Sequence, residues 1–323
     1  MQRNLKKERR GNIRGSHAKT DIILKNFWEQ NDRFADVFNA ALFGGKPVIV
    51  PERLETADTD VSGVIRLKGE VQSLARIRDV VKKSVMGVDF MLLGLESQGN
   101  VHYAMPLRSM LYDGLSYLKE CRGLSRRMKR EKNSRSPSSD EFLSGMRKED
   151  RLHPVITLVI YYGEKNWDGP LSLRDMVMEM PKEVEELFVD YRLHLLQVGE
   201  SERCRFQNEE VKAVFELSRE IFRGNFRTIE EKYKEKYISP EVLTVVGKIT
   251  ESEELMAQGK KGEVHNVCTA LENLEMRCRE EGYSSGVQEN VQKLYRKGFP
   301  KENISELLEI PMEKVEEYCR EDG

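Results

Sequence analysis

Two acidic residues, Asp79 and Glu96, flank a segment whose pattern predicts a β-hairpin. Gly87 interrupts this segment, and an apolar run over residues 88–95 ends abruptly at Glu96. If Gly87 and Val88 form a two-residue turn, residues whose numbers sum to 175 face each other across an antiparallel pair. Asp79 then lies opposite Glu96, and two carboxylates share one position at the end of the hairpin.

The side chains at this position have the chemistry of a metal site. Directly opposed side chains have Cβ atoms about 5 Å apart, where like charges repel, so a cation between Asp79 and Glu96 would stabilise the pair. The pleat places Gln98 on the same face as Glu96. Two acids holding Mg²⁺ or Mn²⁺ beside a polar group can activate water at a phosphodiester. The alternative interpretation is an exposed hairpin end with solvated charges, because a slip of one residue would separate the acids.

The order of these residues resembles a known nuclease signature. Asp79 followed by Glu96-x-Gln98 is similar to the Asp…(Glu/Asp)-x-Lys signature of the PD-(D/E)XK nuclease superfamily, with Gln in the lysine position. Five segments resemble, in order, blocks of the Rpn family, whose members are described as recombination-promoting nucleases or YhgA-like transposases: residues 34–39, 78–80, 93–98, 102–108 and 154–163. The resemblance covers about residues 27–200.

This resemblance implies a fold and an activity. The fold would be α/β, with a restriction-endonuclease-like mixed β-sheet flanked by helices over residues 20–200. The activity would be Mg²⁺-dependent DNA endonuclease chemistry, with Asp79 and Glu96 holding the metal and Gln98 positioning the water. Gln cannot supply the positive charge of Lys, and it cannot act as a base near neutral pH. The alternative is therefore a catalytically lapsed nuclease fold that binds nucleic acid or another protein.

Arg108 and Tyr112 lie on a predicted helix that begins near Pro106 and runs to about Leu118. Their spacing of four residues places them side by side, next to the apolar face of that helix. From there they could reach the acidic pair or a phosphate, or they form an ordinary surface Arg beside a half-buried Tyr. In the Rpn family an Arg-x-x-x-Tyr pair recurs after the Glu-x-Gln strand, which favours substrate binding by these two residues.

Three further side chains are candidates for the site. Asp36 belongs to a predicted helix over residues 22–43 and is a third candidate acid. The sequence does not decide whether the helix face that carries Asp36 points toward the site. Lys82 and Lys83 lie in the first strand of the predicted hairpin and are candidate contacts to substrate phosphates.

Charge is distributed unevenly along the 323 residues. Residues 1–139 hold 26 Lys and Arg against 16 Asp and Glu, whereas residues 140–323 hold 27 against 39. A basic catalytic half predicts DNA binding through phosphates without sequence preference. Residues 120–140 hold seven Lys and Arg side chains and are predicted to form a flexible loop, which is either solvated or tracks a phosphate backbone.

The remaining elements complete the predicted architecture. Val155–Tyr162 is a nearly continuous apolar run typical of a strand buried on both faces, and Asp190–Val198 is a further strand candidate. We expect a sheet of four or five strands. Residues 201–262 are predicted to be a helical connector.

Residues 263–323 are predicted to form a helical module with helix-turn-helix spacing, including helices over Lys301–Leu308 and Met312–Arg320. The second of these helices carries Glu313, Glu316 and Glu317, whose negative charges would repel DNA phosphates. This pattern favours protein contact, including a homo-oligomer formed through these helices, over DNA reading.

Three features of the sequence indicate the cellular compartment of the protein. No run of 18 apolar residues occurs, and the basic N-terminal segment is not followed by a signal-peptide stretch. The five cysteines are scattered without C-x-x-C spacing, which suits a reducing compartment. We expect a cytoplasmic protein that does not enter the membrane.

Overall fold

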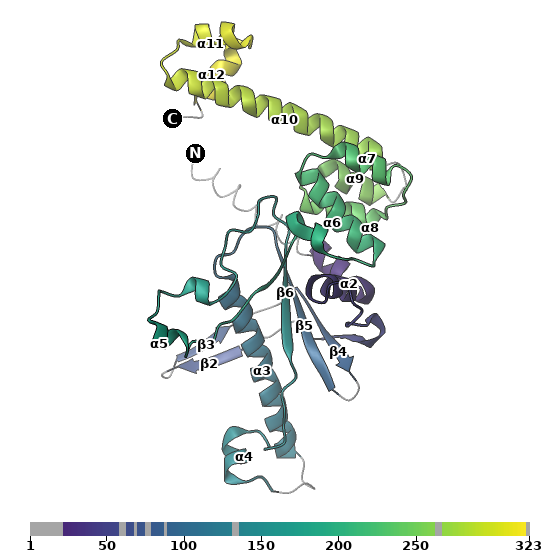
Figure 1. Cartoon of the computed structure of the whole chain (residues 1–323), viewed down its shortest axis with the longest axis vertical. Coiled ribbons are helices and arrows are strands. Elements are labelled where there is room, and N and C mark those ends of the chain that lie inside the picture. Colours follow the sequence, from purple (N-terminus) through teal and green to yellow (C-terminus); the bar gives the residue numbers. More distant parts are fainter. Residues whose placement is uncertain are drawn as a thin grey trace. The chain divides into compact units, whose positions relative to one another are not determined.

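A five-stranded mixed sheet forms the centre of the fold (Figure 1). The computed structural model of the protein describes residues 22–57, 63–67, 70–74, 79–86, 89–130, 136–261 and 267–320. The strands follow the spatial order β1 (Leu54–Thr56), β4 (Val80–Met86), β5 (Asp89–Gln98), β6 (Val155–Tyr161) and β7 (His194–Gln197). The β1–β4 and β4–β5 pairs are antiparallel, whereas β5–β6 and β6–β7 are parallel. The predicted α/β class and the strand number are confirmed.

Helices cover both faces of this sheet, as a parallel core requires. On one face, α3 (Met105–Arg130) packs against β6, where Met105 meets Val159 and Tyr161. On the other face lie residues 22–28, which are helical, and α2 (Asn31–Leu42). The alternation of side chains along β4 and β5 therefore decides which helix each one meets.

The helix α3 extends well beyond the predicted end near Leu118. It continues to Arg130, so the basic segment predicted as a loop over 120–140 is helical for its first half. Arg and Lys are good helix formers that outweigh the cost of Gly123, no Pro interrupts residues 119–130, and cations near a helix C-terminus are favoured by its dipole. Residues 131–135 lie outside the described part of the chain.

A second, two-stranded antiparallel sheet consists of β2 (Gly63–Leu67) and β3 (Glu70–Leu74). The sequence pattern predicts neither this hairpin nor the short β1. Among the described residues, shorter elements include η1 (Pro51–Arg53), α4 (Ser139–Ser144), η2 (Arg174–Met176), α5 (Lys182–Glu185) and η3 (Val198–Arg203).

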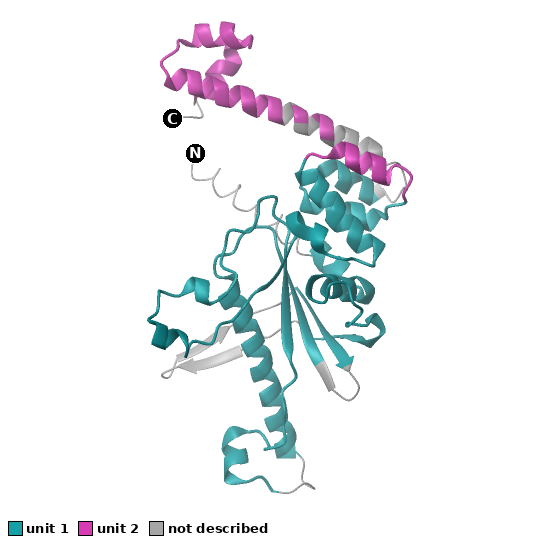
Figure 2. Ribbon diagram, viewed as in Figure 1, with its two compact units in different colours: residues 1–223, 237–264 teal, residues 224–236, 265–323 magenta. Residues whose placement is uncertain are grey.

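The chain divides into two compact units (Figure 2). The first unit includes α6 (Glu209–Phe222), α8 (Pro240–Ile249) and α9 (Glu253–Lys261) as well as the sheet. The guanidinium of Arg33 on α2 ties these helices to the sheet domain, because its Nη2 lies 2.6 Å from Glu210 of α6 and 2.7 Å from Glu241 of α8. Most of the predicted connector is thus part of the first unit.

The second unit contains α7 (Phe226–Tyr233), α10 (Val267–Arg296), α11 (Lys301–Leu308) and α12 (Met312–Arg320). The bounds of α11 and α12 are those predicted, whereas the sequence pattern predicts two helices, over residues 264–281 and 287–297, where the structure has one continuous α10. Val291, Ile304 and Val315 are fully buried where the last three helices meet. Among the helices in the described ranges, none has the length and apolarity needed to cross a membrane.

Candidate active site

The register of β4 and β5 places Asp79 beside Glu96. Paired residues run from Val80 opposite Leu95 to Met86 opposite Asp89, so their numbers sum to 175 as predicted. Asp79 directly precedes β4, and continuing the register brings it opposite Glu96. The turn at residues 87–88, on which the prediction was based, lies outside the described residues.

A hydrogen bond fixes Asp79 at the end of β5. Its Oδ2 accepts from the backbone N–H of Ser97 at 2.6 Å. A charged acceptor makes this a stronger bond than one between neutral groups, so it also fixes the spacing of the two strands where the ladder ends. The Asp79 carboxylate therefore contacts the backbone of the residue that directly follows Glu96.

Glu96 is the most deeply buried acid of the candidate site. Its side chain is 0% exposed, and its Oε2 lies 3.4 Å from Nη2 of Arg108 on α3. Glu96 is paired with Val159 in β6, which places it on the sheet face that α3 covers. A buried carboxylate is costly unless a cation or several donors compensate it, and Arg108 supplies one such cation.

Arg108 is held by a second partner on its own helix. Its Nε donates to the Tyr112 hydroxyl at 2.8 Å, and its guanidinium carbon lies 5.3 Å from the centre of the Tyr112 ring. Burial acts to lower the pKa of Arg108, but attraction to Glu96, with contributions from Tyr112 and Asp79, raises it overall. The predicted Arg-x-x-x-Tyr pair and the two acids are therefore brought together.

Gln98 lies on the same sheet face as Glu96. The parallel register pairs Glu96 with Val159 and Gln98 with Tyr161. No bulge interrupts β5 between Glu96 and Gln98, so both side chains lie on the same face. Gln98 is partly exposed, and its backbone carbonyl accepts from the N–H of Tyr162 at 2.8 Å. An amide at the open end of the strand can donate to or accept from a bound water.

Two adjacent carboxylates fit one kind of metal site. Within the described ranges, no group of three or more His, Cys, Asp or Glu residues lies close enough together to hold an ion. Mg²⁺ is commonly bound through one or two carboxylates while water fills its other positions. The donor set of Asp79 and Glu96 fits this hydrated mode and does not fit a metal cage built from protein ligands alone.

Asp36 does not join these residues, which corrects the expectation of a third acid. Its Oδ1 accepts from the N–H of Gln207 at 2.8 Å, so Asp36 serves the contact between α2 and the start of α6. The side chain is 7% exposed, and burial raises the pKa of this carboxyl despite hydrogen bonds from Gln207 and Asn208. A helical pattern alone could not show which face of α2 met the sheet.

Lys82 is also wrongly placed by the sequence interpretation as a phosphate contact. It is 2% exposed on the sheet face opposite Glu96, and its Nζ donates to the Glu29 carbonyl and to Asn31 Oδ1, each at 2.7 Å. Burial lowers its pKa. Lys83 alternates onto the face of Asp79, is partly exposed, and lies beside Glu55 of β1.

A buried acid that the sequence interpretation missed is Asp113 on α3. Its two carboxylate oxygens accept from the Thr157 hydroxyl of β6 at 2.6 Å and from the Tyr191 hydroxyl at 2.5 Å. These bonds fix α3, and with it Arg108, against the sheet. The sequence feature that could have indicated a buried acid is the position of Asp113 between Tyr112 and Leu115, beside the apolar face of the helix.

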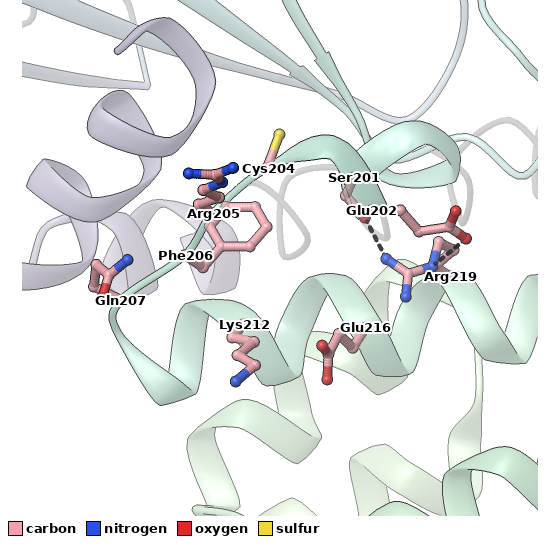
Figure 3. Close-up of a pocket in the computed structure, with 9 residues that line it drawn as sticks. All are labelled: Ser201, Glu202, Cys204, Arg205, Phe206, Gln207, Lys212, Glu216 and Arg219. Atoms are coloured by element: carbon pink, nitrogen blue, oxygen red, sulfur yellow. Dashed lines mark hydrogen bonds and ion pairs between the residues drawn. The ribbon is translucent and has the colours of Figure 1, made fainter. Parts of the chain in front are cut away.

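A cleft of about 410 Å³ lies elsewhere in the first unit (Figure 3). Its lining residues lie between positions 201 and 219, in the end of η3, the following loop and α6. Arg219 on this wall donates to the Ser201 hydroxyl at 3.0 Å and lies 3.4 Å from Glu202. None of the residues predicted for the metal site lines the cleft.

Comparisons of the chain with family models, with curated proteins and with solved structures found no match. Interpretation of the site therefore depends on its geometry and on the motif resemblance.

Proposed function

We propose that this protein is a metal-dependent DNA endonuclease of the PD-(D/E)XK type, related to the Rpn family and built on a restriction-endonuclease-like sheet. The observation that carries the proposal is the β4–β5 register, which brings Asp79 beside Glu96. The bond from Ser97 to Asp79 and the contact of Glu96 with Arg108 support it, because they gather both acids and a cation at one end of the sheet.

Each residue of the candidate site has a distinct proposed role. Asp79 and Glu96 hold Mg²⁺ or Mn²⁺, which when bound supplies an acidified water and neutralises charge on the phosphodiester. Gln98 orients the attacking water through its amide. Arg108, fixed by Tyr112, contacts the phosphate, because a guanidinium matches phosphate geometry.

DNA is the proposed substrate because exposed basic residues lie on the same helix as Arg108, about 30 Å farther along its axis. The last turn of α3 carries Arg127, Lys129 and Arg130, all of them exposed. Lys83 lies on the same sheet face as the acids and is kept as a proposed phosphate contact. Such contacts would hold a duplex without reading its sequence, which suits a role in recombination. Cytoplasmic location, where the DNA would be met, is part of this proposal.

The second unit is proposed to mediate homo-oligomer formation. Several large apolar side chains are exposed on its helices and turns, namely Tyr283, Tyr295, Phe299 and Leu307. The acidic residues on α12 oppose close contact with phosphates.

A lapsed nuclease is the second candidate function, and one specific observation favours it. Arg108 already gives Glu96 a cation from the chain itself, so the carboxylate is compensated without metal. Together with Gln98 in the lysine position, this arrangement suits a protein that has kept DNA binding and lost cleavage.

Nicking of supercoiled plasmid by the purified full chain tests the proposal. We expect nicking with Mg²⁺ or Mn²⁺, abolition by EDTA, and loss of nicking in Glu96→Gln with DNA binding retained. Glu52→Gln, at an exposed acid on η1, is the control and should nick as the unmodified protein does. DNA binding without nicking at any enzyme excess would favour the lapsed nuclease. Undiminished nicking by Glu96→Gln would place the active site elsewhere.

A further inference from the structure

We propose that the Arg108 guanidinium is the resident counter-charge of Glu96, and that a divalent cation must displace it in order to bind. Arg108 would then move to the phosphodiester and supply the positive charge that Gln98 lacks. This inference rests on the proposed function, and it concerns how the same site passes from its metal-free to its metal-bound state.

The geometry of the ion pair suits a replaceable partner. Glu96 is 0% exposed, so its charge needs a compensating group at all times. The contact between Nη2 of Arg108 and Oε2 of Glu96 is 3.4 Å long, near the long limit for a charge-assisted hydrogen bond. Arg108 is therefore a nearby cation that is not held tightly to Glu96.

The other contacts of Arg108 would remain after it leaves Glu96. The Tyr112 hydroxyl lies 2.8 Å from Nε, whereas the nitrogen facing Glu96 is Nη2, so different parts of the guanidinium make the two contacts. The side chain is also 32% exposed, which leaves it a route towards solvent and a docked phosphate. Tyr112 would thus act as a pivot that keeps the guanidinium near the site.

Electrostatics makes the two cations compete. A divalent ion held by Asp79 and Glu96 would lie close to Arg108, and like charges at short separation repel strongly at the effective dielectric of a protein surface. One divalent ion also neutralises both carboxylates, whereas the single charge of Arg108 cannot. Metal entry therefore favours the departure of Arg108 from Glu96, and Arg108 in turn weakens metal binding.

The experiment measures metal binding by the full-length chain without any cleavage assay. Mn²⁺ and Mg²⁺ are titrated into the unmodified protein and into Arg108→Gln by calorimetry, and thermal midpoints are recorded with and without metal. We expect Arg108→Gln to bind Mn²⁺ about tenfold or more tightly, because a competing charge is gone. Its midpoint should fall without metal and recover at saturating Mn²⁺.

Three further variants separate this mechanism from a merely structural role. Arg126→Gln removes an exposed arginine from the same helix and should leave Mn²⁺ affinity unchanged. Arg108→Lys keeps the charge and should bind Mn²⁺ nearly as weakly as the unmodified protein. The double variant Arg108→Gln/Glu96→Gln carries no buried charge at this position, so it should regain stability and lose its response to Mn²⁺, which keeps the test valid even where Arg108→Gln folds poorly.

Equal or weaker Mn²⁺ binding by Arg108→Gln than by the unmodified protein would overturn the inference. A Mn²⁺ response that survives in the double variant would overturn it as well, because the ion would then bind away from Glu96. The outcome is separable from that of the proposed function. Displacement without nicking rejects only the nuclease, whereas nicking with unchanged metal affinity in Arg108→Gln rejects only the displacement.

Discussion

The two faces of the β4–β5 hairpin each bury one charged side chain, and the two charges are compensated differently. On one face the Lys82 ammonium has two fixed neutral acceptors, a backbone carbonyl and an amide oxygen, both at 2.7 Å. On the other, the Glu96 carboxylate faces the partly exposed Arg108 at 3.4 Å. The first arrangement is fixed by two short contacts from a buried donor, whereas in our proposal the second exchanges one cation for another. Burial alone therefore does not mark a functional charge, and the exchangeability of its partner is more informative.

The largest effect that would sharpen this comparison is expected from Asp79→Asn. The amide oxygen can still accept from the Ser97 N–H, so the strand ends stay together, but the negative charge that would hold the cation is lost. We expect plasmid nicking to fall at least about 100-fold, with little change in the free energy of unfolding. Nicking at the unmodified rate would show that Asp79 only fixes the strands.

Lys82→Met should have the opposite profile. It keeps most of the apolar stem but leaves the Glu29 carbonyl and Asn31 Oδ1 without their shared donor in a buried setting. We expect a loss of about 2–4 kcal/mol in the free energy of unfolding, measured in urea, and unchanged nicking per folded molecule. Lys83→Met, at the partly exposed neighbouring position, is the control and should cost less. A nicking defect in stable Lys82→Met would contradict the assignment of Lys82 to the structural face.

Asp36 provides a test that depends on pH. Because burial raises its pKa in the folded state, its contribution to stability is fully present below the ordinary value near 3.9 and is lost as pH rises through the folded value. The stability of the unmodified protein relative to Asp36→Asn should therefore decline from pH 4 upward, as measured by urea unfolding. Glu52→Gln, at an exposed acid on η1, is the control. A relative stability that rises with pH would contradict this sign.

The smallest effect concerns DNA affinity. Replacing Lys129 and Arg130 at the end of α3 by Gln should weaken binding to duplexes of any sequence alike and lower the slope of log affinity against log salt by about 2. Fluorescence anisotropy at several salt concentrations measures both quantities. An unchanged slope would remove the end of α3 from the proposed DNA surface.

The part of the site that follows from local patterns was predictable. The hairpin register depends on a turn, on alternation and on the abrupt polar end of an apolar run, all of which are present in residues 79–98. The same holds for β6 and for the bounds of α11 and α12, where apolar periodicity and turn residues coincide.

Features that depend on tertiary contacts were not predictable. Lys82 and Asp36 carry charges that usually mark a surface, and only the packing of α2 and α6 buries them. The length of α3 was underestimated because a run of basic residues was taken as a loop, although each is a good helix former. The contact between Arg108 and Glu96 requires α3 to lie across the sheet, which sequence spacing cannot show.

The order of strands in the sheet has a consequence for biosynthesis. β4 precedes β5 directly, but β6, the partner on the other edge of β5, begins only after a further 56 residues, 99–154. At roughly 5–20 residues per second on the ribosome, the apolar edge of β5 waits several seconds for its partner. An unpaired edge of this kind can template pairing with another chain. During that interval the edge of β5 is open to such pairing unless another segment or a bound chaperone covers it.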